Sequence, residues 1–171
     1  TIHSITQDSK GYLWIATDNG ISRFDGNSFV NYDNFNGLSE NKSIKLWIDE
    51  SDNLFVNHPN KKVTKVSSDL TFEIIDSFPN PVSFHEKTKN SICKIDTNNG
   101  VMIHSKSPFR IDSKNGLVED KINTVFVGRQ HILWVGTQNN GLQSIPLQNF
   151  ASYNWRNDNT LNNCYQLNNK T

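Results

Sequence analysis

Residues 8–21 read DSKGYLWIATDNGI, and residues 128–142 read GRQHILWVGTQNNGL. Both stretches contain Leu-Trp, then a β-branched residue, a small residue and Thr, and both continue into a turn that ends in Gly and an aliphatic residue. The match extends downstream, where Phe29 and Tyr32 correspond at identical spacing to Phe150 and Tyr153. A pattern that recurs along the chain in this way indicates a repeat architecture.

Two weaker copies lie between these stretches. In Asp49–Val56 the Trp position is taken by Phe55, and in Asp96–Ile103 by Met102. The column of large side chains then runs through Trp14, Phe55, Met102 and Trp134, with uneven intervals. A second marker, Asn-Gly-Leu, occurs at 36–38 and 115–117, with Asn-Thr-Leu at 159–161 as a weak third copy. The average period is about 40 residues, which is typical of a propeller blade.

Each repeat has the local chemistry of β-structure. Short runs rich in Val, Ile, Phe, Trp and Thr alternate with clusters of Asp, Asn, Gly and Ser, and Asp18-Asn19-Gly20 and Asp25-Gly26 are tight hairpin signals. In the first repeat we expect strands near 2–7, 12–17, 20–24 and 28–32. Four strands in each period of about 40 residues predict an all-β chain, a β-propeller of about four blades with four antiparallel strands each.

The repeats predict blade boundaries within one propeller domain: 1–35, 36–80, 81–114 and 115–158, with 159–171 as the start of a further blade. The third blade is degenerate, because the stretch from Met102 to Gly116 is much shorter than the corresponding stretch from Trp14 to Gly37. Either this blade has lost a strand, or Val82-Ser83-Phe84 is its first strand and the register is shifted by one strand. The sequence leaves both alternatives open.

The composition excludes several classes of protein. The chain has 17 Lys and Arg against 17 Asp and Glu, so its net charge is zero and it has no electrostatic basis for binding nucleic acid. No run approaches the roughly 20 apolar residues of a membrane-spanning helix. The repeat register places Cys93 and Cys164 at the start of the first strand of non-neighbouring repeats, so we expect two free thiols.

Two segments, 5–26 and 133–142, closely resemble the two-component regulator propeller repeat. In the first segment the matching positions are Ile5, Asp8, Gly11-Tyr12-Leu13-Trp14-Ile15-Ala16-Thr17, Gly20-Ile21 and Arg23-Phe24-Asp25-Gly26. The resemblance implies part of a seven-bladed propeller in the extracytoplasmic sensor of a hybrid two-component histidine kinase. It implies a periplasmic location in an inner-membrane protein, a homodimer of the parent sensor, and membrane attachment only through a span outside these residues. It also implies oligosaccharides or other small molecules as ligands.

Catalysis finds little support, and we expect neither a metal nor a cofactor. The five histidines show no ligand spacing and are interpreted as surface or turn residues: His3, His58, His85, His104 and His131. A sialidase-like propeller needs several arginines that converge on a carboxylate, and the chain has only Arg23, Arg110, Arg129 and Arg156, of which Arg23 occupies a repeat position. Asp49-Glu50-Ser51-Asp52-Asn53 could suggest Ca²⁺, but we interpret it as the turn of its repeat.

Among the four tryptophans, Trp14 and Trp134 are expected in the core between blades, although exposed aromatic side chains could stack on sugars. Trp47 and Trp155 fall outside the Trp column, and Trp155, in the linker 153–158, is the better candidate for a surface aromatic residue. The ligand-binding residues remain unknown at this point.

The function expected from the sequence is therefore recognition of a ligand and signalling across the membrane, with no enzymatic activity in this segment. The alternative is a non-signalling propeller scaffold that binds protein or glycan in a secreted protein. A third reading, a propeller hydrolase, would require acids or arginines clustered at one face. With about four blades, the chain is expected either to form an open arc cut from a longer sensor and stabilised by self-association, or to close as a small propeller.

Overall fold

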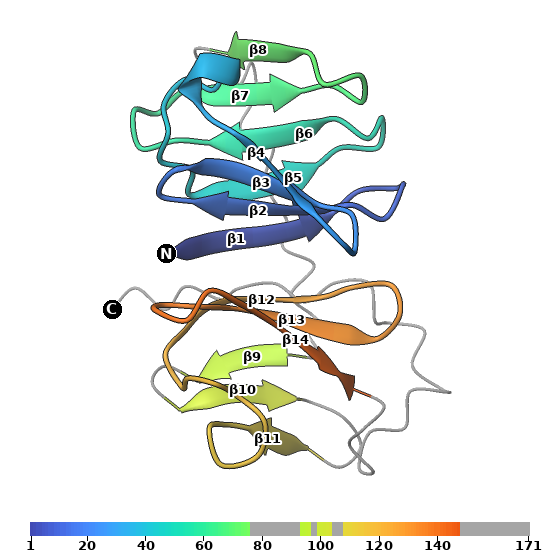
Figure 1. The fold of residues 1–171 in the computed structure, drawn as a ribbon, viewed down its shortest axis with the longest axis vertical. Helices are drawn as coiled ribbons and strands as arrows, with labels where there is room; N and C mark the ends of the chain where they lie inside the picture. The colour runs from blue at the N-terminus through green and yellow to red at the C-terminus, as the bar shows by residue number, and fades with distance from the viewer. Residues whose placement is uncertain (76–92, 97–98, 104–107, 148–171) are drawn as a thin grey trace. The chain divides into compact units, whose positions relative to one another are not determined.

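The computed structural model describes residues 1–75, 93–96, 99–103 and 108–147, with only the backbone described at 93–96 (Figure 1). The chain divides into two compact units, residues 2–84 and residues 85–171 together with Thr1, and each is treated by itself below. The described regular structure consists of β-strands and one short 3-10 helix. No helix within the described ranges is long and apolar enough to span a bilayer.

The first sheet of residues 2–84 confirms the strands predicted for the first repeat. It comprises β1 (Ile2–Gln7), β2 (Leu13–Thr17), β3 (Gly20–Phe24) and β4 (Phe29–Tyr32). The strands pair antiparallel in the order β1-β2-β3-β4, which is the simple meander of a propeller blade. An irregularity in the register interrupts the β1–β2 pairing between Ile2 and Ser4.

The second sheet repeats this meander. Its strands β5 (Lys45–Ile48), β6 (Leu54–Asn57), β7 (Val63–Val66) and β8 (Phe72–Ile75) pair in the order β5-β6-β7-β8. Between the two sheets the chain passes through the 3-10 helix η1 (Asn34–Asn36). Asp33 caps this helix by accepting from Phe35 N, and the helix ends at Gly37 in the left-handed conformation.

The core of residues 2–84 lies between these two sheets. Trp14, which is 4% exposed, packs in one cluster with Ala16 of the same strand and with Leu54 and Val56 of β6. Side chains alternate between the faces of a strand, so Phe55 lies on the opposite face of β6, where its ring stacks on Trp47 at 5.3 Å. Phe55 occupies the same repeat position as Trp14 but is only half-buried.

Residues 85–171 contain two further sheets. One comprises β9 (Cys93–Asp96), β10 (Gly100–Ile103) and β11 (Phe109–Ile111), and the other β12 (Ile122–Val127), β13 (Ile132–Thr137) and β14 (Leu142–Pro146). The β12–β13 pairing has an irregularity between Ile122 and Thr124, the counterpart of the one in β1. The buried side chains of both sheets form one cluster: Val101, Ile103, Ile111, Leu117, Ile122, Val125, Val127, Leu133, Val135, Ile145 and Leu147.

The third sheet resolves the register that the sequence left open. Gly100 begins the strand that pairs with both β9 and β11, and a Cβ on Gly100 would collide with the Ile111 carbonyl, as one on Gly20 would with the Tyr32 carbonyl. The turn after β11 also copies the one after β4, because Leu117 N donates to Asp112 O as Leu38 N donates to Asp33 O. Strands β9, β10 and β11 are therefore equivalent to β2, β3 and β4.

This equivalence corrects the Trp column. Met102 lies on the third strand of its repeat, and the position equivalent to Trp14 is Cys93, which pairs with Ile103 as Trp14 pairs with Arg23. The corrected column of Trp14, Phe55, Cys93 and Trp134 is nearly evenly spaced. Cys93 accordingly lies on a second-strand equivalent and not at the start of a first strand. The shifted alternative is the one supported, and its first strand, Val82–Phe84, lies outside the described residues.

The all-β fold with blade-type antiparallel sheets is confirmed. The first two sheets each have four strands, and the other two each show three strands within the described ranges. The blade boundaries and the seven-bladed ring remain predictions. The fourth-blade strand expected around Phe150–Tyr153 and the further blade at 159–171 lie outside the described residues.

Candidate functional site

Three hairpin turns of residues 2–84 border a cleft at one end of the two sheets. These turns follow β1, β5 and β7, and the cleft encloses about 350 Å³, including space open to solvent. We call it the inter-sheet cleft, and its lining is mixed: charged side chains at the turns and aliphatic side chains from β5, β6 and β7. The lining residues are Asp8, Lys10, Tyr12, Trp14, Arg23, Ile48, Asp52, Leu54, Val66, Ser67, Ser68 and Leu70.

Asp8 ties the first turn to the core. Its side chain is 7% exposed; Oδ1 accepts from Tyr12 N at 2.8 Å and Oδ2 from Trp14 Nε1–H at 2.9 Å. The Gly11 N–H donates to the Asp8 carbonyl, which closes the turn. A buried carboxylate requires such donors, so Asp8 fixes both the turn and the indole that lines the cleft.

Arg23 brings a guanidinium to the cleft from β3. Its Cζ lies 4.7 Å from the centre of the Tyr12 ring and 5.7 Å from that of Trp14, distances at which a cation is attracted by an aromatic face. Trp14 and Arg23 are direct partners in the β2–β3 pairing. The sheet register therefore places the cation beside the two rings.

Polar contacts join the turns across the cleft. Asp52 accepts from Ser9 N at 2.8 Å and from Ser9 Oγ at 2.7 Å, and Lys10 Nζ donates to the Ser68 carbonyl at 3.4 Å. Asp52 has a φ of 63°, in the left-handed region. The rim of the cleft thus consists of two acids and two bases, which gives it no formal net charge.

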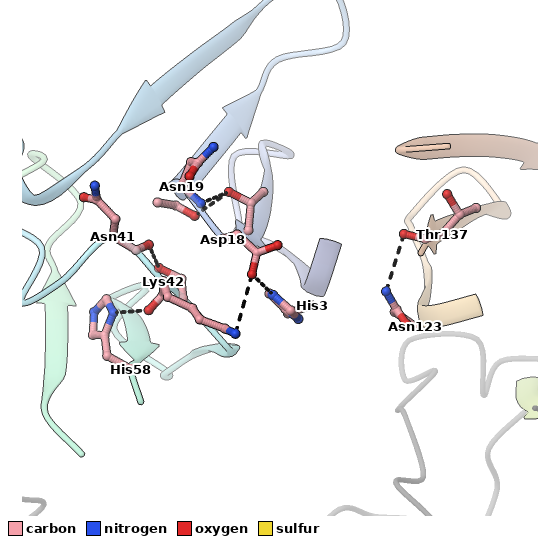
Figure 2. A network of polar contacts seen from close by, with 11 residues as sticks. His3, Asp18, Asn19, Asn41, Lys42, His58, Asn123 and Thr137 are labelled. Atoms are coloured by element: carbon pink, nitrogen blue, oxygen red, sulfur yellow. Dashed lines mark hydrogen bonds and ion pairs between the residues drawn. The ribbon is translucent and has the colours of Figure 1, made fainter. Parts of the chain in front are cut away.

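A second polar cluster lies at the other end of the two sheets, where Figure 2 shows His3 and Lys42 pointing toward Asp18. His3 Nε2 lies 2.9 Å from Asp18 Oδ1, and Lys42 Nζ lies 3.7 Å from the same oxygen. The hydrogen bond to His3 is the largest cause that lowers the pKa of Asp18, and loss of hydration opposes it. Both partners remain accessible to solvent, so this cluster connects the β2–β3 turn to the linker between the sheets.

His58 of the same cluster is a buried link, with 1% of its surface exposed. Nδ1 lies 2.9 Å from the Lys42 carbonyl (Figure 2). Nε2 lies 3.0 Å from Thr64 Oγ1. A carbonyl can only accept, so Nδ1 bears the proton. Burial lowers the pKa of His58, and the Lys42 carbonyl and Glu40 oppose this shift. His58 therefore holds the linker as a neutral ring.

Residues 85–171 have their own polar turn contacts. Glu119 accepts from Asn139 N, Asn139 Nδ2 and Asn140 Nδ2; loss of hydration alone would raise the pKa of Glu119, but these donors lower it. Figure 2 also shows Asn123, whose Nδ2 donates to the Thr137 carbonyl at 3.5 Å. These contacts stabilise the β13–β14 turn and the β12–β13 pair.

The remaining candidate residues occupy structural positions. Asp49 accepts from Ser51 N, Asn53 N and Asn53 Nδ2, so the Asp49–Asn53 stretch is a turn, as predicted. Burial raises the pKa of Asp49, but these donors outweigh it and lower the pKa. No group of three His, Cys, Asp or Glu side chains in the described ranges could hold a metal ion. Among the histidines, His131 lies at a turn with a φ of 57°, and His85 and His104 lie outside the described residues.

The predicted core position is confirmed for Trp14; for Trp134 it stays a prediction, because the strand and the blade expected to follow β14 lie outside the described residues. Trp134 is half-buried, whereas Leu133 and Val135 on the opposite face of β13 form the core of their unit. Gly128 stands where the first repeat has Asp8. Trp47 stacks on Phe55. Trp155, Arg156 and Cys164 lie outside the described residues, and among the arginines that the structure describes Arg23 is the one that lines the inter-sheet cleft.

Comparison with known families identifies the first repeat. Residues 1–19 match the family model described as "Two component regulator propeller". The match covers β1, the turn after it and β2, including Asp8 and Trp14, and it confirms the resemblance found in the sequence. A search of the curated proteins returns no match.

Several solved structures are similar at low identity. The extracellular domain of one hybrid two-component system from B. thetaiotaomicron is 16% identical, with a TM-score of 0.41 over 85% of this chain and 27% of that one. A second such domain from the same organism is 21% identical, with a TM-score of 0.39 over 86% and 21% of the two chains. Virginiamycin B lyase from Staphylococcus aureus is 19% identical, with a TM-score of 0.37 over 86% and 53%. The chain thus spans about half or less of the length of these proteins.

Proposed function

We propose that this chain is a ligand-recognising segment of the extracytoplasmic propeller of a hybrid two-component sensor histidine kinase. The observation that supports it is the match of residues 1–19 to the two-component regulator propeller. The matched segment also supplies one wall of the inter-sheet cleft, through Asp8, Tyr12 and Trp14. A rigid sheet pair with polar side chains at its turns is suited to recognition, because loops on a scaffold are where binding residues concentrate.

The proposed mechanism is a shift between two arrangements of a homodimeric ectodomain in the periplasm. A ligand that binds one arrangement better moves the population toward it, and the kinase follows. The proposed ligands are oligosaccharides or other small molecules, and the membrane would be reached only through a span outside this segment. The segment itself is proposed to have no enzymatic activity.

The experiment is to reconstitute the full-length parent receptor in membrane vesicles and to measure kinase autophosphorylation against a panel of oligosaccharides. We expect at least one of them to change the rate, and the same one to bind the isolated complete ectodomain by calorimetry. A variant with the phospho-accepting histidine of the kinase replaced is the control for signal specificity. If no oligosaccharide binds the ectodomain and none changes the kinase, the proposal fails.

The second candidate is a non-signalling propeller scaffold that binds protein or glycan in a secreted protein. It is favoured by the mixed aromatic and charged lining of the inter-sheet cleft, which requires no signalling partner. Fractionation of the native protein distinguishes the two candidates. A sensor remains with the inner membrane after salt washing, whereas a secreted scaffold is found in the medium.

A further inference from the structure

We infer that the inter-sheet cleft binds a small carboxylate-bearing ligand, with Arg23 as the principal anion-binding group and Lys10 as the second. This inference rests on the proposed function in one respect, that the segment binds a ligand. It adds the position of the site and the chemical class of the ligand.

The first argument is the state of Arg23. Tyr12 and Trp14 hold its guanidinium beside the cleft, and within the described ranges no carboxylate lies at ion-pair distance from it. A guanidinium has five N–H donors in a planar fork that matches a carboxylate in two parallel hydrogen bonds. The aromatic rings stabilise the positive charge in part, but they cannot accept the two parallel N–H hydrogen bonds that a carboxylate accepts.

The second argument is the contrast between the acids and the bases of the cleft. The oxygens of Asp8 accept from Tyr12 N and Trp14 Nε1, and those of Asp52 accept from both donors of Ser9. Among the residues that the structure describes, Lys10 Nζ makes one long hydrogen bond, to a backbone carbonyl. The acids are therefore engaged within the protein, and the bases keep donors for a ligand.

The third argument is the floor of the cleft. Leu54 and Val66 are buried, and Ile48 and Leu70 are half-buried, beneath the charged rim. Apolar walls lower the local dielectric constant and strengthen a charged hydrogen bond. The arrangement suits a compact organic acid, whose carboxylate meets Arg23 while its carbon skeleton contacts the aliphatic side chains.

The test uses three probes that share one ring and differ in charge: D-glucuronate, D-glucose and D-glucosamine. Each is titrated into the whole chain at neutral pH, with binding followed by calorimetry and by NMR chemical shifts. We expect glucuronate to bind at least about tenfold tighter than glucose, since hydrogen bonds to charged groups are the strong ones. We expect glucosamine to bind no better than glucose, and added salt to weaken glucuronate binding alone.

Variants with opposite expected effects identify the groups. Arg23→Gln should weaken glucuronate binding about ten- to a hundredfold, and Lys10→Ala about two- to fivefold. Asp52→Asn should strengthen it, because it removes a negative charge while the amide can keep both contacts to Ser9 and tolerates the left-handed backbone. Lys114→Ala removes an exposed lysine of the other unit and is the matched control, with no change expected.

Lys10 and Asp52 lie at exposed or half-exposed turn positions, so these two variants test the inference even if Arg23→Gln fails to fold. Equal binding of the three probes, no binding of glucuronate, or affinities that Lys10→Ala and Asp52→Asn leave unchanged would overturn it. The proposed function is tested separately. A kinase that responds to oligosaccharides while glucuronate does not bind this cleft would retain the sensor and remove the site. Glucuronate binding in this cleft with no kinase response to any oligosaccharide would retain the site and remove the sensor function.

Discussion

At the scale of single residues, Asp8 illustrates how one side chain serves both the fold and the candidate site. The same turn recurs after β5, where Asp49 makes contacts within its own turn, and after β12, where the position is Gly128. Of these three residues, Asp8 is the one that accepts a hydrogen bond from an indole in the described structure, from Trp14 Nε1. The carboxylate thereby connects the hairpin turn to the core and to the wall of the inter-sheet cleft.

Replacing Asp8 with Asn should destabilise the protein. An amide retains one acceptor oxygen but presents an NH₂ group to one of the two donors, so a buried N–H loses its partner, at a cost of about 1–3 kcal/mol. Asp49→Asn at the equivalent, exposed turn is the matched control and should cost about 1 kcal/mol or less. Urea unfolding followed by tryptophan fluorescence measures both. Equal losses in the two variants would show that the indole contact contributes nothing.

His58 makes stability depend on pH. Burial is the largest cause of its lowered pKa, and its ordinary value is 6.5. Below pH 6.5 the unfolded chain binds a proton that the folded protein does not, so the free energy of unfolding falls as the pH falls, by at most about 1.4 kcal/mol per pH unit. The loss ends when the folded ring also becomes protonated.

Urea unfolding between pH 8 and pH 5 tests this expectation. His58→Gln should be less stable at pH 8, because it alters the bonds to the Lys42 carbonyl and Thr64 Oγ1, yet its stability should change less with pH than that of the wild type. Identical pH dependence in the two proteins would contradict the assignment of His58 as a buried neutral ring.

The sequence predicted part of the candidate site. Trp14 was correctly expected in the core, because its position follows from the alternation and register of one hairpin. The presence of Arg23 in the cleft did not follow from the repeat, since its equivalents are Lys65, Ile103 and Ser144. The inter-sheet cleft was not predictable, since it combines turns from two sheets that are distant along the chain. The burial of Trp134 could not be read from its repeat position alone, because it depends on which strands cover that face of β13.

At the scale of elements, the start of the third strand is the most constrained point of the repeat. Gly20 has a φ of 107°, and a Cβ there would collide with the backbone carbonyl oxygen of Tyr32. The close approach lets β3 begin directly beside the end of β4. Neither the turn nor the pairing can shift without loss of the sheet register.

Gly20→Ala should therefore lower the free energy of unfolding by about 3 kcal/mol or more. This loss exceeds the strain of a left-handed backbone alone, because the new Cβ also collides with the Tyr32 carbonyl. Gly11→Ala is the matched control, because Gly11 has a φ of 93° but no atom within 4 Å of a Cβ. It should cost only the conformational strain, about 1–2 kcal/mol. Thermal unfolding compares the two, and similar losses would show that the contact with Tyr32 is relieved by a small shift.

The same element explains why the third repeat was misaligned. Met102 is the large side chain that fits the expected Trp position by size, although the equivalent residue in the strand pairing is Cys93. A turn signal was present: Asn99-Gly100-Val101 parallels Asn19-Gly20-Ile21. Backbone requirements at glycine are preserved where side-chain size is not, so turns are the safer guide to register in a degenerate repeat.

At the scale of the whole molecule, two clusters account for most of the buried side chains among the described residues. One cluster joins the two sheets of residues 2–84 and includes Trp14 and Val56, and the other joins the two sheets of residues 85–171 and includes Val101 and Leu133. The neutral charge and modest apolar fraction of the chain suit this arrangement, because burial is confined to facing sheets while the turns remain polar. Arrays of this kind are stabilised by each unit and its nearest neighbours.

This division predicts that damage to one core stays local. Leu133→Ala removes a fully buried side chain of the second cluster and should cost about 2–5 kcal/mol there. Hydrogen exchange followed by mass spectrometry should show faster exchange in β9–β14 and unchanged protection in β1–β8. Val56→Ala, in the first cluster, should give the reverse pattern with a smaller loss, since fewer methyl groups are removed. Faster exchange throughout the chain in both variants would mean that the two cores unfold as one cooperative unit.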